Sequence, residues 1–398
     1  MNEAVRRAVV ALTTSYPLRR TDWAGIFIQR LYAGFEHTGV IVVCPAVDRA
    51  PEPSEVPHVQ VVAARYAPTA WQTLAQRSGG VAPGLKKHPW RIAMLPGLLL
   101  SMATQVWRAA RQGDLIHANW AVCGAIAAPV AAVRGLPLVT TLRGDDVKRA
   151  GVSRIDRWLL EVACRRSRVI VCVSDAMAAS LKAMLPGIEA KVHVVRNGVD
   201  DVFLAVPREA RAENAPVRIG AIGSLIPRKG FDVLLRAIHH MRHVPAELTI
   251  VGAGPEKNAL MAQVVALGVE ERVTFAGELP PADVPGFLAS LDIFVLSSRS
   301  EGRPNVVIEA LAAGLPVVST DLPGVAGLIG DTTGWRVPTD DAVALGAALD
   351  DACSDTDRLA RMGASARNLM LADGGWRRAA AEYEALFAHA IATHEETR

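Results

Sequence analysis

The sequence predicts an α/β protein built from two doubly wound domains. The chain of 398 residues is too long for one ordinary hydrophobic core. Short runs of β-branched residues alternate with longer amphipathic stretches, which is typical of parallel sheets covered by helices. A polar stretch rich in Ala, Pro and Glu, residues 207–216, interrupts this alternation once. The interruption places a domain boundary near residues 203–216.

The strand and helix patterns follow this order along the chain. A first strand at 9–12 is followed by a loop and a helix from about 25 to 36, and further strands are expected at 40–43, 115–117, 138–141 and 169–173. After the interruption, strands are expected at 217–222, 248–251, 273–275, 293–296 and 316–319. A last amphipathic helix is expected from 375 to 397.

These patterns predict two Rossmann-like domains. The first is residues 1–205, with the C-terminal helix 375–398 packing back on it, and the second is residues 206–374. In such sheets ligands bind beyond the carboxyl ends of the strands, so we expect the site in a central cleft that both domains face.

Composition and charge argue against several classes of protein. A net charge of +3, without a dense basic block, argues against a nucleic-acid partner. The five cysteines form no CxxC pair, so we expect buried thiols rather than disulfides or a zinc site. The apolar run 8–12 is too short for a signal segment, and Pro96 and Gly97 interrupt the longest apolar stretch. We therefore expect a cytoplasmic protein.

The segment Glu301–Glu309 carries the most specific pattern. Gly302 permits close backbone approach to a ligand, and Pro304 suits the first position of a helix. The amides of Asn305 and Val306 would then face an anion at the positive end of the helix dipole. Glu301 and Glu309 would flank that anion, one carboxylate holding a ribose and the other a transferred sugar.

A second group follows the first strand of the second domain, in Gly223-Ser224-Leu225-Ile226-Pro227-Arg228-Lys229-Gly230. Arg228 and Lys229 are adjacent cations at a strand end. They can neutralise the charge that grows on a leaving diphosphate. A solvated basic turn is the plain alternative, and it is less favoured because the anion-binding helix start comes from the same sheet.

The first domain carries weaker signals at its strand ends. Gly25 is expected to approach the donor phosphates, although a plain turn glycine fits as well. His117 and Asn119 end one strand, and Arg143 and Asp146 follow another, where acceptor groups would lie. A buried structural histidine remains the favoured alternative for His117. Asp145 and Asp146 have no third ligand at a sensible spacing, so we expect no metal.

Residues 86–111 suggest a membrane contact. Lys86, Lys87, Trp90 and Arg91 precede an apolar stretch that ends in Trp107-Arg108 and Arg111. Cations and tryptophans at the ends of an apolar helix suit the membrane interface, and an ordinary core helix with a basic end is the alternative.

Taken together, these motifs resemble the glycosyltransferase family 4 enzymes of the GT-B fold, over nearly the whole chain. The resemblance rests on the E-x7-E segment Glu301–Glu309 with its continuation through Val318, on Pro227-Arg228-Lys229-Gly230, and on Asn197-Gly198-Val199-Asp200. Their joint occurrence in order is far more specific than any single motif.

The resemblance implies a retaining hexosyltransferase that needs neither metal nor cofactor. It implies that Glu309 binds the donor ribose, that Glu301 and the Gly302 backbone contact the donor sugar, and that Lys229 with a neighbouring cation stabilises the leaving diphosphate. The amides of Asn305 and Val306 would meet the phosphates, while Arg303 and Ser224 are expected to line the same donor site. The acceptor hydroxyl would attack on the face that the nucleotide leaves.

Two positions depart from the family pattern. Many members have Arg directly after Gly223, where this chain has Ser224, and Arg228 is our hypothesis for the missing charge. Many members have His where this chain has Asn119, so the role of Asn119 in catalysis stays open. His117 cannot replace it, because two residues along a strand shift the position by roughly 6.6 Å.

The sequence therefore predicts transfer of a sugar from a UDP- or GDP-sugar to a glycan or lipid-linked acceptor, in synthesis of a cell-surface polysaccharide or glycolipid at the inner face of the membrane. The alternatives are a nucleotide-sugar epimerase of the same fold and an inactive sugar-nucleotide-binding protein. The sequence selects neither the nucleotide, the sugar nor the acceptor.

Overall fold

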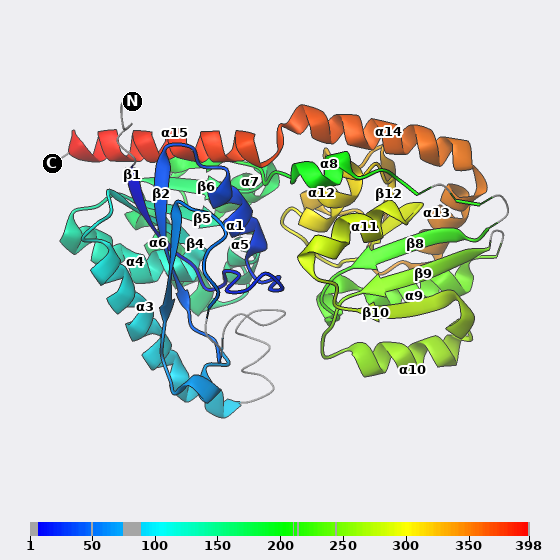
Figure 1. Ribbon diagram of the computed structural model, residues 1–398, viewed down its shortest axis with the longest axis horizontal. Helices are drawn as coiled ribbons and strands as arrows, with labels where there is room; N and C mark the ends of the chain where they lie inside the picture. The colour runs from blue at the N-terminus through cyan, green and yellow to red at the C-terminus, as the bar shows by residue number, and fades with distance from the viewer. Residues whose placement is uncertain are drawn as a thin grey trace. The chain divides into compact units, whose positions relative to one another are not determined.

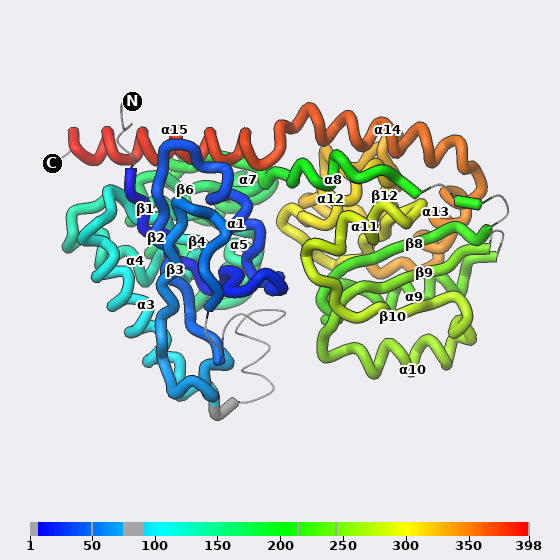
Figure 2. Tube along the Cα trace, viewed as in Figure 1, coloured from blue at the N-terminus to red at the C-terminus, as the bar shows by residue number. Residues whose placement is uncertain are grey.

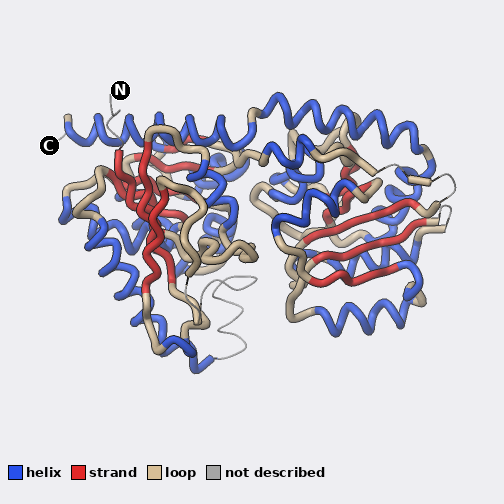
Figure 3. Tube along the Cα trace, in the orientation of Figure 1, coloured by secondary structure: helices blue, strands red, loops and turns tan. Residues whose placement is uncertain are grey.

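The computed structural model describes residues 7–48, 51–74, 89–209, 211–212, 215–242 and 245–396. The chain divides into two compact units. Unit 1 comprises Met1–Asn197 and Trp376–Arg398, and unit 2 comprises Gly198–Gly375. Each unit has a core of strands covered by helices (Figure 3).

In unit 1, the described residues form a seven-stranded parallel sheet in the order β3-β2-β1-β4-β5-β6-β7. The strands are β1 (Arg7–Leu12), β2 (Thr38–Pro45), β3 (Val59–Ala64), β4 (Leu115–Asn119), β5 (Leu138–Leu142), β6 (Val169–Cys172) and β7 (Val192–Val194). The order reverses at β1, so the loops that follow β1 and β4 meet at the carboxyl edge where such sheets bind ligands.

Both faces of this sheet are covered, because alternate residues of each strand enter different cores. One face packs against α1 (Ile26–Ala33) and the C-terminal helix α15 (Gly375–Glu395). The red α15 thus returns to the blue N-terminal strands (Figures 1 and 2). The other face packs against α3 (Leu95–Ala109), α4 (Ala121–Arg134), α5 (Asp145–Ala150), α6 (Arg154–Arg166) and α7 (Asp175–Met184).

In unit 2, the described residues form a six-stranded parallel sheet in the order β10-β9-β8-β11-β12-β13. The strands are β8 (Val217–Ile222), β9 (Ala246–Val251), β10 (Val273–Gly277), β11 (Ile293–Leu296), β12 (Val317–Thr320) and β13 (Gly334–Val337). The helices are α8 (Asp201–Ala205), α9 (Phe231–His240), α10 (Lys257–Leu267), α11 (Val284–Ala289), α12 (Asn305–Ala312), α13 (Ala342–Ser354) and α14 (Thr356–Asp373). The loops after β8, β11 and β12 share one carboxyl edge.

The predicted fold class, two doubly wound α/β domains, is confirmed. The sequence pattern missed the edge strands β3 and β13 and the short β7, and it made the first helix too long. That helix begins after Gly25, whose φ of 79° is left-handed, and ends at Gly34. The five cysteines are all buried free thiols, as predicted.

Candidate functional site

A buried ion cluster lies at the carboxyl edge of the unit 2 sheet. The Lys229 Nζ lies 2.7 Å from Glu301 Oε1, and the Arg228 guanidinium lies 3.6 Å from Glu301 Oε2. The Ser298 hydroxyl donates a further hydrogen bond of 2.8 Å to Glu301 Oε1. The structure therefore brings Lys229 into contact with Glu301, 72 positions further along the chain.

The cluster holds Glu301 in its charged form. Its side chain is only 9% exposed, and that of Lys229 is 15% exposed. Burial alone raises the pKa of the Glu301 carboxyl, but the charges of Lys229 and Arg228 and the hydrogen bonds from Lys229 and Ser298 outweigh it, so the pKa lies below its ordinary value. The two cations and one carboxylate leave a single positive charge at this edge, which favours an anion.

A second layer of contacts, which was not predicted from the sequence, holds the backbone of the cluster in place. Arg299 makes a two-pronged pair with Asp232 of α9, with N–O distances of 3.0 and 2.8 Å, and a third contact of 2.6 Å with Asp340. Its guanidinium also donates to the Pro227 carbonyl. These bonds tie the loop after β11 to the turn after β8, so that the charged groups on both loops keep their spacing.

Gly230 is required where the two loops meet. Its φ is 64°, and a Cβ at this position would lie 2.1 Å from the Ser297 carbonyl oxygen. The Ser297 hydroxyl in turn donates a hydrogen bond of 3.0 Å to the Lys229 carbonyl. The glycine that ends the Pro-Arg-Lys-Gly turn therefore permits the close approach that brings Lys229 to Glu301.

Helix α12 begins directly after this loop. Pro304 is its N-cap rather than its first residue, with φ −73° and ψ 113°, so the predicted position was wrong by one residue. Asn305 is the first helical residue, and the carbonyl of Pro304 accepts from Val307 and Ile308. The amides of Asn305 and Val306 therefore occupy the positive end of the helix, as an anion site requires.

The remaining predicted donor residues lie in α12, in the loop before it and in the turn after β8. Glu309 is buried one turn along α12. Gly302 is packed against Gly324, where a Cβ would lie 2.5 Å from the Gly302 carbonyl oxygen. Arg303 is 7% exposed at its side chain and lies 3.8 Å from Asp373 of α14, which indicates packing within unit 2. Ser224 lies in the turn after β8, where its carbonyl accepts from Ile226.

In unit 1, His117 and Asn119 belong to a fully buried hydrogen-bond chain, both with 0% of the residue exposed. Asn119 Nδ2 donates to the Tyr32 hydroxyl at 3.0 Å, which leaves that hydroxyl to donate to His117 Nδ1 at 3.0 Å. His117 Nε2 then donates to Thr141 Oγ1 at 2.9 Å, and Thr141 lies 3.1 Å from the Tyr383 hydroxyl of α15. In this arrangement His117 Nδ1 accepts a hydrogen bond and Nε2 donates one, so the His117 imidazole is neutral.

The electrostatics agree with this assignment. Burial, followed by the positive charge of Arg143, lowers the pKa of His117 well below its ordinary value. His117 is therefore a neutral link in the chain rather than a group exposed to a ligand. Tyr32 and Tyr383 escaped the sequence analysis, because nothing local connects a helix tyrosine to a strand 85 residues away.

At the Asn119 end, the chain of hydrogen bonds continues to Arg143, which is partly exposed at the carboxyl edge of the sheet. Its guanidinium donates to Asn119 Oδ1 at 2.7 Å and to Asn197 Oδ1 at 3.1 Å, and it lies 5.0 Å from the centre of the Phe27 ring. Asp146 accepts the backbone amides of Arg143 and Ala121 at 2.9 and 2.8 Å. The carboxylate of Asp146 therefore shapes the loop that presents Arg143.

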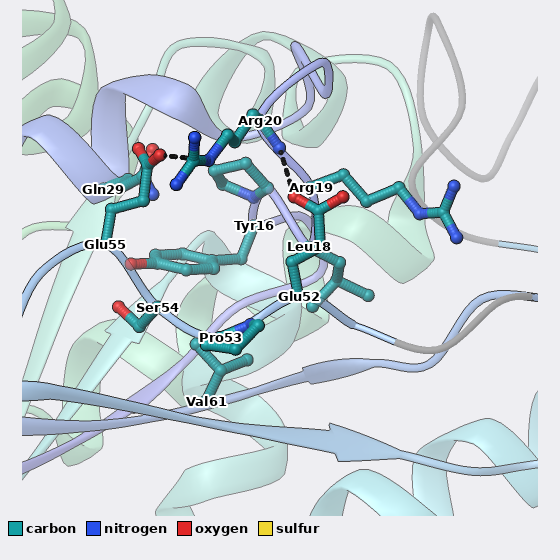
Figure 4. Close-up of a pocket in the computed structure, with 11 residues that line it drawn as sticks. Tyr16, Leu18, Arg19, Arg20, Gln29, Glu52, Pro53, Ser54, Glu55 and Val61 are labelled. Carbon is teal, nitrogen blue, oxygen red and sulfur yellow. Dashed lines mark hydrogen bonds and ion pairs between the residues drawn. The ribbon is translucent and has the colours of Figure 1, made fainter.

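The loop after β1, including Tyr16, and residues 52–55 line a small pocket (Figure 4). The cavity measures about 20 Å³, which is room for one water molecule and far too little for a sugar. Among the described residues, the buried Tyr16 hydroxyl has no hydrogen-bond partner, which such a water would supply. Gly25 closes the same loop, where a Cβ would lie 2.3 Å from the Ser15 carbonyl oxygen. The left-handed φ of 79° and this contact both require glycine at position 25.

Within the predicted membrane segment 86–111, residues 86–88 lie outside the described residues. Ile92 and Leu100 are 62% and 70% exposed. Trp107 is 36% exposed, and the Arg134 guanidinium lies over its ring, 3.7 Å from the ring centre. In the part of the chain that the structure describes, we find no helix with the length and apolar character to cross a bilayer.

Comparisons with known proteins agree with this geometry. Residues 28–203 match the family model Glycosyltransferase Family 4, and residues 216–355 match the model Glycosyl transferases group 1. A GDP-mannose-dependent alpha-(1-6)-phosphatidylinositol monomannoside mannosyltransferase of Mycolicibacterium smegmatis is 34% identical over 198 residues, which cover 45% of this chain and 52% of that protein. The first curated relatives are matched over 52% to 64% of their own lengths.

Solved structures show the fold over nearly the whole chain. Sucrose-phosphate synthase from Thermosynechococcus elongatus superposes with a TM-score of 0.81 at 17% identity, covering 98% of this chain and 100% of that one. Anabaena HepE, solved with UDP and glucose, superposes with a TM-score of 0.75 at 18% identity, covering 96% and 100%. The two units thus have the GT-B architecture, and the two family models together span most of both. The chain belongs to glycosyltransferase family 4.

Proposed function

We propose that the protein transfers a sugar from a nucleotide-sugar donor to a glycan or lipid-linked acceptor in the synthesis of a surface polysaccharide or glycolipid. The observation that carries the proposal is the Lys229–Arg228–Glu301 cluster beside the start of α12. A diphosphate needs cations and amide donors at one place, and a sugar needs a nearby carboxylate that stays ionised. Unit 2 supplies all three at one sheet edge.

In this proposal each group has one task. The amides of Asn305 and Val306 hold the phosphates, and Lys229 with Arg228 stabilises the charge that develops as the diphosphate leaves. Glu301 orients the transferred sugar and Glu309 the ribose. Transfer proceeds with retention, the leaving phosphate takes the proton of the acceptor hydroxyl, and neither a metal nor a cofactor takes part.

We assign Arg143 to the acceptor side. It is the cation that the unit 1 network presents at its sheet edge, while His117 and Asn119 position it from within. Because HepE was solved with UDP-glucose, a UDP-sugar is the first donor to test, and the GDP-mannose-dependent relative makes GDP-mannose the second. Exposed Ile92 and Leu100 support a membrane contact of residues 86–111.

The test is hydrolysis of UDP- and GDP-sugars without acceptor, with separation of all sugar products. A transferase gives slow release of the free sugar and nucleoside diphosphate, with the anomeric configuration of the donor retained in the first product. A sugar isomer in the nucleotide-bound pool would indicate an epimerase, and absence of turnover in spite of tight nucleotide binding would indicate a binding protein.

The variant Lys229→Met sharpens this test. It removes the cation but keeps the aliphatic stem, and we expect release to fall by roughly 100-fold or more, the usual effect of removing one group that stabilises a developing charge. Lys257→Met, on exposed α10, is the matched control and should act like the parent. Equal rates for both variants would contradict the role of Lys229.

A further inference from the structure

We propose that the start of α6, with the turn before it, is a docking surface for a bilayer rich in anionic lipid. Three large apolar side chains are mostly exposed there: Val152 is 90% exposed, Ile155 73% and Trp158 60%. Ile155 and Trp158 are three residues apart and share one face of the helix. The opposite face of α6 packs Leu160 and Cys164 into the hydrophobic core, and the exposed apolar side chains are not part of that core.

The exposure belongs to an ordered element. The Arg149 carbonyl accepts the amides of both Val152 and Ser153, at 3.1 and 2.8 Å. The Ser153 hydroxyl caps the helix by accepting the Asp156 amide. The Arg149 side chain also pairs with Asp156 at 2.8 Å. The apolar tip is therefore held rigidly outward rather than left loose.

The charge of this surface favours an anionic bilayer as its ligand. Within residues 148–158, the apolar side chains are interleaved with four cations and one carboxylate, listed as Lys148, Arg149, Arg154, Arg157 and Asp156. Asp156 is already paired with Arg149. A tip of tryptophan and aliphatic residues ringed by excess positive charge matches an interface where acyl chains lie below anionic headgroups.

A protein partner fits this surface less well. A stable protein interface uses about 20 to 30 residues on each side, with a packed core and few charges at its centre. Here only three large apolar side chains project from the turn and the first turns of one helix, and cations lie between them in the sequence. A bilayer needs no matching concavity, because acyl chains and headgroups rearrange around inserted side chains.

This surface also belongs to the same side of unit 1 as the exposed residues of α3. Helix α4 packs between α3 and α6, and all three cover the same face of the sheet. In chain order, α3 comes after β3 and α6 comes after β5 and α5, and both strands end at the carboxyl edge of that sheet. Two separate contacts on one side would hold unit 1 in one orientation against a bilayer, which a single contact would not.

The experiment is vesicle flotation with the full chain. We expect binding to phosphatidylcholine vesicles that contain about a third phosphatidylglycerol, and loss of this binding in pure phosphatidylcholine or at ~0.5 M salt. Replacing Val152, Ile155 and Trp158 together by Ser should lower the bound fraction at least ~10-fold. Replacing Lys148 and Arg154 by Gln should lower binding about fivefold for each charge.

Two controls make the result decisive. A triple serine variant of exposed apolar residues in unit 2, Met261, Val265 and Val343, should float like the parent. All variants should also hydrolyse sugar nucleotide at the parental rate, which separates this proposal from the proposed function and confirms folding. The proposal is overturned if the parent ignores anionic vesicles, if the α6 variant floats like the parent, or if that variant instead converts a parental dimer into a monomer.

Discussion

Replacing Glu301 by Gln tests the charge balance of the unit 2 cluster. The substitution keeps the size of the side chain but leaves Lys229 and Arg228 facing each other without their carboxylate. Breaking a buried ion pair costs about 3–5 kcal/mol. Since the Arg228 side chain is 37% exposed, solvent screens part of its charge, and we expect roughly 2–3 kcal/mol.

This cost should appear as a lower melting temperature. For a unit of this size each kcal/mol lowers Tm by about 2–4 °C, so the transition of unit 2 should fall by about 4–12 °C at pH 7. Differential scanning calorimetry of the full chain measures this, with exposed Glu271→Gln as the matched control.

The pH dependence identifies the cause. The pKa of Glu301 in the folded protein lies below its ordinary value of 4.5, so the pair contributes fully above pH 4.5 and its contribution is lost as the pH falls through the lower, folded value. The difference in Tm between parent and Glu301→Gln should therefore shrink below pH 4.5. A difference that is absent at pH 7, or that stays constant down to pH 3, would refute the ion-pair explanation.

Two further predictions concern the supports of the two sites. His117→Phe should reduce the pH dependence of unit 1 stability, measured by urea unfolding. In the parent, His117 takes up a proton below pH 6.5 only in the unfolded chain, because burial lowers its pKa in the folded protein. The free energy of unfolding of the parent therefore falls by up to 1.36 kcal/mol for each pH unit below 6.5, and the variant lacks this contribution. An unchanged slope would place the proton uptake elsewhere. Gly230→Ala should lower stability by more than about 1 kcal/mol and weaken binding of nucleoside diphosphate measured by calorimetry, because a Cβ meets the Ser297 carbonyl at a φ of 64°; Gly268→Ala has a similar φ of 65° but open space, so it isolates the contact.

Much of the fold was predictable because its determinants are local. Alternating β-branched runs and amphipathic stretches repeat along the chain, and a parallel sheet then brings the ends of its strands to one edge. That geometry is why Lys229 and Glu301 could be expected near each other. The edge strands β3, β7 and β13 were missed because their short runs carry less of the pattern.

Other parts depend on contacts that leave no trace in a local pattern. Thr141 and Tyr383 meet over 242 residues, and Arg299 and Asp232 over 67. In the sequence, Arg299 is indistinguishable from a solvent-exposed arginine, because its partner Asp232 is distant along the chain. The sequence favoured a buried structural histidine at position 117 and kept an acceptor contact as the other interpretation; in the structure both ring nitrogens of His117 are hydrogen-bonded.

The same network gives a physical account of Asn119, where many family members carry histidine. The side chain at this position has to accept from a guanidinium and donate to a phenol at the same time. The amide of Asn119 does both without charge, through Oδ1 to Arg143 and Nδ2 to Tyr32. An imidazole can do both only as one neutral tautomer, and its protonation would set a second positive charge beside Arg143. Asparagine therefore keeps the presentation of Arg143 independent of any titration at this position, and His117 is left as the one imidazole of the described chain of hydrogen bonds.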